Sequence, residues 1–193
     1  MARPATPLSA AAVVAAAADL ADADGPGTLT LAGVAAHLGV RTPSLYNHVA
    51  GLDDLRRRLA LLVMTELADR LRSAAVGLAG PDAVRALLSA ARDYALAHPG
   101  RYGFVARAPD QSDTELAQAA GQAVDVFLAG LRAYGLTGDQ AVHAVRALRS
   151  AVHGFVMLET GGGFGLPQDL DDSFATLVEL VVAGLAARAP ERG

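Results

Sequence analysis

The stretch LGVRTPSLYNHV, residues 38–49, carries the strongest structural signal in this chain of 193 residues. Gly39 permits the left-handed backbone that commonly ends a helix. Thr42 is predicted to cap the next helix with its hydroxyl, and Pro43 suits a first helical position because no N–H is needed there. The stretch therefore predicts a tight turn followed by a short helix from Pro43 to Val49.

A supporting helix is predicted directly before this turn. Apolar residues recur at helical spacing from Leu31 to Leu38, and the Thr30 hydroxyl is placed to cap their helix. In the second helix, Leu45 and Val49 lie four positions apart and are expected to pack inward. Its outward side chains suit phosphates and base edges, and they are Ser44, Tyr46, Asn47 and His48. The two helices and their turn predict a helix-turn-helix.

This segment resembles the DNA-binding domain of the TetR/AcrR family of repressors, where the string Leu-Gly-Val-x-x-Pro-Ser/Thr-Leu-Tyr-x-His-Val is expected. The resemblance covers roughly the first third of the chain. It implies DNA contacts by Thr30, Arg41, Thr42, Pro43, Ser44, Tyr46 and His48, to which the outward position of Asn47 adds one more. The family usually has a lysine near the start of the exit helix, but this chain has Leu52 there, with Arg56 as the nearest substitute.

Composition narrows the class of protein. The chain is 52% hydrophobic and has no cysteine, which excludes a disulfide scaffold, a zinc finger and a cysteine nucleophile. No apolar run reaches membrane-spanning length, and residues 1–9 lack a secretory apolar core. We therefore expect a soluble, cytoplasmic protein without a membrane segment.

The charge balance restricts how DNA is bound. The whole chain has a formal net charge of −4, and residues 1–60 contain as many aspartates as arginines. A domain without a basic patch is expected to depend on helix N-termini, hydroxyl groups and a symmetric second copy. The same weak basic character leaves open an alternative function, a helical interaction module of this fold without operator-specific DNA binding.

The rest of the chain also predicts helices, so the fold class is all-α. We expect a helix-turn-helix domain over residues 1–52, a connecting helix over 53–80 and a helical ligand-binding and dimerisation domain over 81–193. The stretch SAVHGFVMLE, residues 150–159, resembles a TetR subfamily with a Trp-His-Gly signature, although Val152 replaces the tryptophan. That resemblance implies a homodimer formed by the last two long helices and an interior that binds an inducer.

A polar stripe marks the helix predicted from Asp139 to Thr160. Its positions recur at steps of four and three, so they share one face that looks toward water, a cavity or a second copy. We predict a small-molecule pocket with an aromatic and thioether wall, lined by Tyr102, Phe104, Phe127, Arg146, Ser150, His153 and Met157. The alternative places Arg146 and His153 at the dimer surface. No metal or other cofactor is expected, because His143 and His153 lie too far apart on one helix to share an ion.

The last helix is predicted to form the dimer interface through a wide apolar face. Its members are Phe174, Leu177, Val178, Val181, Val182 and Leu185. Enzymatic motifs are missing: residues 161–163 are glycines without phosphate-loop spacing, and no Gly-x-Ser-x-Gly occurs. The sequence therefore predicts a ligand-responsive repressor that binds a palindromic double-stranded operator as a homodimer and responds to an unidentified small-molecule inducer.

Overall fold

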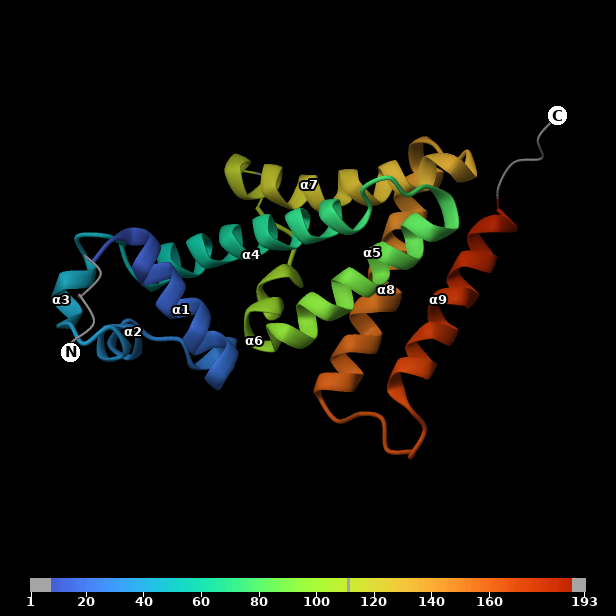
Figure 1. Ribbon diagram of the computed structural model, residues 1–193. Coiled ribbons are helices and arrows are strands. Elements are labelled where there is room, and N and C mark those ends of the chain that lie inside the picture. Colours follow the sequence, from blue (N-terminus) through green and yellow to red (C-terminus); the bar gives the residue numbers. More distant parts are fainter. Residues whose placement is uncertain (1–7, 111, 189–193) are drawn as a thin grey trace. The chain divides into compact units, whose positions relative to one another are not determined.

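The computed structural model describes residues 8–110 and 112–188, and every regular element within these ranges is helical (Figure 1). The elements are α1 (Ala10–Asp24), η1 (Pro26–Thr28), α2 (Leu31–His37), α3 (Thr42–Leu45), α4 (Leu52–Ala74), α5 (Gly80–Ala97), α6 (Pro99–Tyr102), η2 (Gly103–Val105), α7 (Thr114–Leu131), η3 (Arg132–Tyr134), α8 (Gly138–Thr160) and α9 (Leu170–Ala186). The predicted all-α class is confirmed. The outer ends of the predicted domains, residues 1–7 and 189–193, lie outside the described residues.

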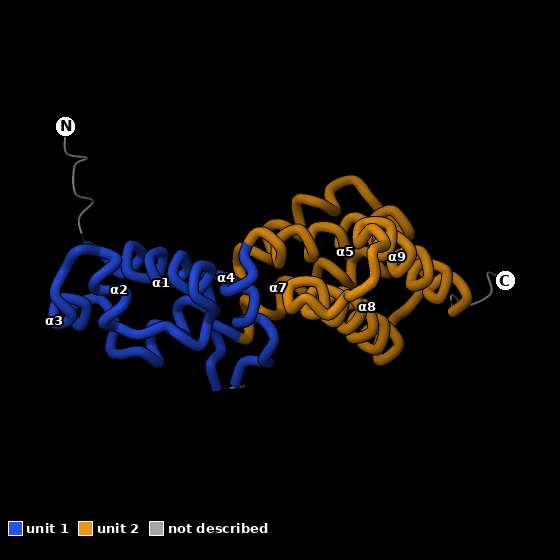
Figure 2. Tube along the Cα trace, turned by 90° about the horizontal axis from the view of Figure 1, so that it is seen from below, with its two compact units in different colours: residues 1–63, 98–116 blue, residues 64–97, 117–193 orange. Residues whose placement is uncertain are grey.

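The chain divides into two compact units, which we call the head and the body (Figure 2). The head contains residues 1–63 and 98–116, and the body contains residues 64–97 and 117–193. The chain passes from one unit to the other inside α4, after α5 and near the start of α7. This division differs from the continuous domains expected from the sequence, because residues 98–116 belong with the N-terminal helices.

The head is built on α1, which begins after a serine N-cap. The Ser9 hydroxyl accepts a hydrogen bond from the Ala12 N–H at 3.1 Å, as an N-cap should. Along the helix, Val13 and Ala17 are completely buried. Gly25, with φ of 88°, ends α1. Helix α1 packs against both α2 and α6, so α6 is part of the head's core.

A glycine sets how closely α6 approaches α1. A Cβ placed on Gly100 would lie 1.6 Å from the Ala21 carbonyl oxygen, a distance that no side chain can occupy. Glycine is therefore required at this position, because a Cβ would collide with the backbone of α1. The backbone cannot move aside as a flexible side chain can.

The body packs α5 against α8 and α9 around one buried charge. Arg92 is only 8% exposed, and its Nε and Nη2 donate to both carboxylate oxygens of Glu159 at 2.9 and 2.6 Å. Its Nη1 lies 2.7 Å from Asp171, and its guanidinium carbon lies 4.8 Å from the centre of the Phe174 ring. A buried arginine needs such partners because its desolvation is costly. This cluster links α5 to the last two helices.

Candidate nucleic-acid interface

The turn between α2 and α3 has the geometry that the sequence predicted. Gly39 has a φ of 67°, and its N–H donates to the Ala36 carbonyl at 3.1 Å. The Val40 N–H donates to the Ala35 carbonyl at 3.0 Å, which completes a Schellman motif. At the other end of α2, the Thr30 hydroxyl accepts from the Gly33 N–H at 3.1 Å and caps the helix. Both ends of α2 are therefore fixed by local hydrogen bonds.

Two details of the second helix were predicted wrongly. Helix α3 ends at Leu45 rather than Val49, and Tyr46, Asn47 and His48 form the turn that follows it. Its N-cap is Arg41 in extended conformation, and Thr42 is already the first helical residue. Thr42 cannot cap the helix because a cap must precede the helical backbone. The Val49 N–H still donates to the Leu45 carbonyl at 3.0 Å, so helical hydrogen bonding continues beyond α3.

The burial pattern gives this segment an inner and an outer face. Leu45 and Val49 are buried at 0% and 2% exposure, as their spacing predicted. Tyr46 is 58% exposed, which is unusual for a large aromatic side chain and calls for an explanation. Among the other predicted DNA contacts, Thr30, Arg41, Pro43 and Asn47 are exposed, and Thr42, Ser44 and His48 are half-buried. The structure thus places the predicted contact residues on adjoining segments of one small motif.

Half of the described arginines of the head are paired with carboxylates. The described part of the head has six arginines against eight aspartates and glutamates. Arg57 contacts Asp113 and Glu115, and Arg58 pairs with Asp54 at 2.9 Å. Close to the helix-turn-helix in sequence, Arg41 is exposed and Arg56 is half-buried, and neither has a carboxylate partner among the described residues. Among the described residues near the helix-turn-helix in sequence, these two arginines are the ones free to contact phosphates.

The predicted ligand residues are divided between the two units. Tyr102 and Phe104 belong to the head, whereas Phe127, Arg146, Ser150, His153 and Met157 belong to the body. Phe127 is buried, but Arg146, Ser150 and Met157 are exposed along α8. Burial, with a smaller contribution from the Arg149 charge, lowers the pKa of half-buried His153. The ligand pocket remains a prediction, and the exposed members of the α8 stripe favour the alternative position at the surface.

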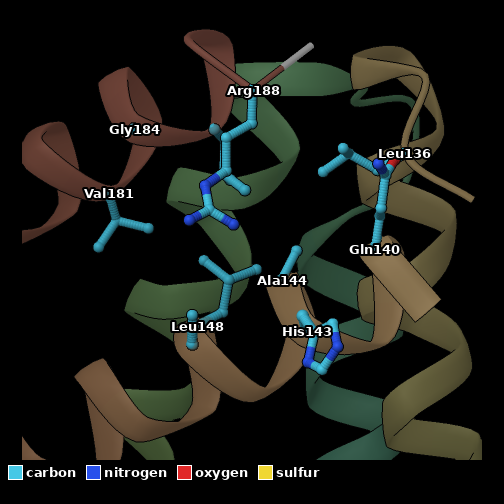
Figure 3. Close-up of a pocket in the computed structure, with 10 residues that line it drawn as sticks. Leu136, Gln140, His143, Ala144, Leu148, Val181, Gly184 and Arg188 are labelled. Carbon is cyan, nitrogen blue, oxygen red and sulfur yellow. The ribbon is translucent and has the colours of Figure 1, made fainter. Parts of the chain in front are cut away.

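The predicted dimer residues also separate into two groups. Phe174, Val178, Val182 and Leu185 are buried in the single chain, while Leu177 and Val181 are half-buried. The face of α9 that remains most open carries Leu180, which is 68% exposed. Beside it, a groove of about 460 Å³ lies between α8 and α9 (Figure 3). Its apolar lining includes Leu136, Ala144, Leu148 and Val181, with Gln140, His143 and Arg188 as polar members.

Among the described residues, none of the helices combines the length and the apolar composition of a membrane span. The same residues contain no group of three or more histidines, cysteines, aspartates or glutamates arranged to hold a metal ion.

A capped helix, a left-handed glycine turn and an outward-facing recognition segment, followed by a helical body, define the helix-turn-helix class of transcriptional regulators. Comparison with known proteins places the chain within that class. Residues 84–181 match the family model described as "Tetracyclin repressor-like, C-terminal domain". The chain belongs to the TetR family of transcriptional regulators. The predicted family, and the prediction of a regulator rather than an enzyme, are therefore confirmed.

Individual relatives agree with this assignment. The chain is 39% identical to the uncharacterized HTH-type transcriptional regulator Rv0681 of Mycobacterium tuberculosis over 100% of this chain and 88% of that protein. It is 32% identical to the HTH-type regulator YobS of Bacillus subtilis over 90% of each chain. Among solved structures, apo ActR of Streptomyces coelicolor matches with a TM-score of 0.71 at 22% identity, covering 96% of this chain and all of ActR. ActR has also been solved in complex with (S)-DNPA.

The paired state of the arginines predicts a weak salt dependence of DNA binding. If Arg41 and Arg56 are the main phosphate contacts of each head, a dimer neutralises about four phosphates and the slope of log K against log salt is about −4. Fluorescence anisotropy with a bound DNA duplex at several salt concentrations measures this slope. A slope near −8 would contradict the assignment, because it would require cations other than Arg41 and Arg56 to contact phosphates as well.

Proposed function

We propose that this protein is a ligand-responsive transcriptional repressor that acts as a homodimer on a palindromic operator. The observation that carries the proposal is the exposure of Tyr46 beside Asn47 at the end of α3, on a motif held by the Gly39 turn. A largely exposed tyrosine offers a hydroxyl donor and a flat ring to DNA. Such uncharged groups can contact DNA in a head that has more acidic than basic residues among those described.

The DNA contacts are tested by removing single polar groups. Tyr46→Phe deletes one hydroxyl, and His48→Ala deletes one imidazole. Each should weaken binding to DNA selected by the wild-type protein from a random duplex library, by about three- to tenfold, which corresponds to one net hydrogen bond. Anisotropy titrations measure the affinity, and circular dichroism checks that the melting temperature is unchanged.

Tyr134→Phe is the matched control for the tyrosine. The Tyr134 hydroxyl is buried and has no hydrogen-bond partner among the described residues, so its removal should leave DNA binding unchanged. Wild-type affinity in both Tyr46→Phe and His48→Ala would contradict the assigned contacts. A wild-type protein that selects no sequence from the library would support the alternative of an interaction module without operator-specific binding.

A homodimer is supported by the two sides of α9. One side of the helix packs inside its own chain, and the other presents Leu180 with the small residues Ala183 and Gly184. Small residues allow a second helix to approach closely, and a large exposed leucine gains most from being covered. The interface we propose therefore lies on the Leu180 side and extends over the groove between α8 and α9. In Figure 3, Val181 and Gly184 lie at one wall of this groove.

Leu180→Asp tests this interface without disturbing the core, because the side chain is exposed in the single chain. We expect the wild type to be a dimer at micromolar concentration and Leu180→Asp to be a folded monomer, as measured by light scattering and circular dichroism. Val76→Asp, at a residue 75% exposed in the α4–α5 connection, should remain dimeric. A folded wild-type monomer would contradict the proposal, as would a Leu180→Asp dimer of unchanged affinity.

The response to a ligand is proposed from the family. ActR, which shares this fold, has been solved in complex with (S)-DNPA. Within the body, Phe127 remains our candidate for an apolar wall, and His153 is the candidate polar group that is partly shielded from water. Arg146 and Ser150 are proposed to lie at the surface of α8, with Met157.

A further inference from the structure

Residues 98–110 and 112–116, which we call the strap, are held on the rest of the head by an ion pair near each end. At the first end, the Asp22 carboxylate of α1 accepts from the Arg101 backbone N–H at 2.8 Å and from its Nε at 2.7 Å. The His98 ring nitrogen Nδ1 lies 3.2 Å from the same carboxylate. Arg101 and Asp22 have side chains only 12% and 19% exposed, so water screens this contact weakly. Gly100 brings the strap against the α1 backbone between these charges.

At the second end, Arg57 of α4 binds two carboxylates. Its Nε and Nη2 donate to the two oxygens of Asp113 at 2.5 and 2.6 Å, and Nη2 also donates to Glu115 at 2.8 Å. A bidentate arginine–carboxylate pair fixes the relative orientation of the two side chains as well as their distance. The hydrogen bond from Arg57 holds the pKa of Asp113 below its ordinary value, so the pair is charged at neutral pH.

The strap matters because of how the chain is connected. The chain connects head and body at three points. One lies within α4, and the other two are the ends of the strap. While the strap is docked, the head has three covalent links to the body. If the strap detaches, only α4 still constrains the head. A less constrained head loses more conformational entropy when two linked heads bind two half-sites together. The affinity for DNA therefore falls.

We propose that Asp22, Asp113 and Glu115 are positioning residues for operator binding, because their ion pairs keep the strap docked on the head. This inference rests on the proposed function, since it concerns binding by two linked heads. It assigns acidic residues a favourable role in DNA binding. Simple electrostatics predicts the opposite, because removing a negative charge strengthens attraction to phosphates.

The sign of this effect is the basis of the test. In the full chain, Asp113→Asn combined with Glu115→Gln removes both carboxylates that face Arg57. Asparagine retains a side-chain oxygen, so it can still accept the Leu116 N–H bond that Asp113 accepts at 3.2 Å. We expect binding to the selected DNA duplex to weaken by about tenfold. If the double variant does not fold, Asp113→Asn alone serves in its place.

A matched variant separates charge from position. Asp24→Asn combined with Asp53→Asn makes the same change in net charge at two exposed aspartates of the head that form no ion pair among the described residues. This control should bind DNA as tightly as the wild type or more tightly. Trypsin cleavage after Arg107, an exposed residue of the strap, reports docking independently of DNA. It should be faster only in the variant that combines Asp113→Asn with Glu115→Gln.

Each outcome of the pair of measurements decides the inference. Weaker DNA binding with faster cleavage after Arg107 supports it, provided that cleavage after Arg72, exposed on α4, is unchanged. Unchanged or tighter binding overturns it, whether or not the strap is cleaved faster, and so does weaker binding with unchanged cleavage after Arg107. A wild-type protein that selects no DNA contradicts the proposed function instead, and the cleavage rates then still show whether the ion pairs hold the strap.

Discussion

The left-handed backbone at Gly39 is the constraint on which the DNA-binding surface depends. Its φ of 67° lets the chain leave α2 and begin α3 within a few residues, with the last carbonyls of α2 satisfied by the turn. A residue with a Cβ adopts this conformation at a cost, whereas glycine does not. The burial of Leu45 and Val49 then fixes the rotation of the segment, so that Tyr46 faces outward.

Local hydrogen bonding explains why much of the motif could be predicted from sequence. The caps at Ser9 and Thr30 and the turn at Gly39 each depend on residues within five positions. The same reasoning failed at Thr42, because threonine is favoured both as a cap and near a helix start, and Arg41 occupies the cap. Residue preferences therefore locate the start of this helix only to within one position, and the backbone conformation decides between the two.

Contacts between distant residues could not be predicted in this way. Asp22 and Arg101 are separated by 79 positions, Arg57 and Asp113 by 56, and Arg92 and Glu159 by 67, so no periodicity connects them. The apolar face of α9 was visible in the sequence, but hydrophobicity alone does not distinguish a chain's own core from an interface with a second copy. Because the ion pairs of the strap join residues far apart in the sequence, the strap was predicted to belong to the larger domain, although these ion pairs attach it to the head.

In the function we propose, two copies of the helix-turn-helix read two half-sites on one DNA. A nuclease footprint of the wild-type protein on its selected duplex tests this arrangement directly. We expect protection of an inverted repeat with half-site centres about one helical turn apart, roughly 34–36 Å. Protection of a single half-site, or protection without any preferred sequence, would contradict it.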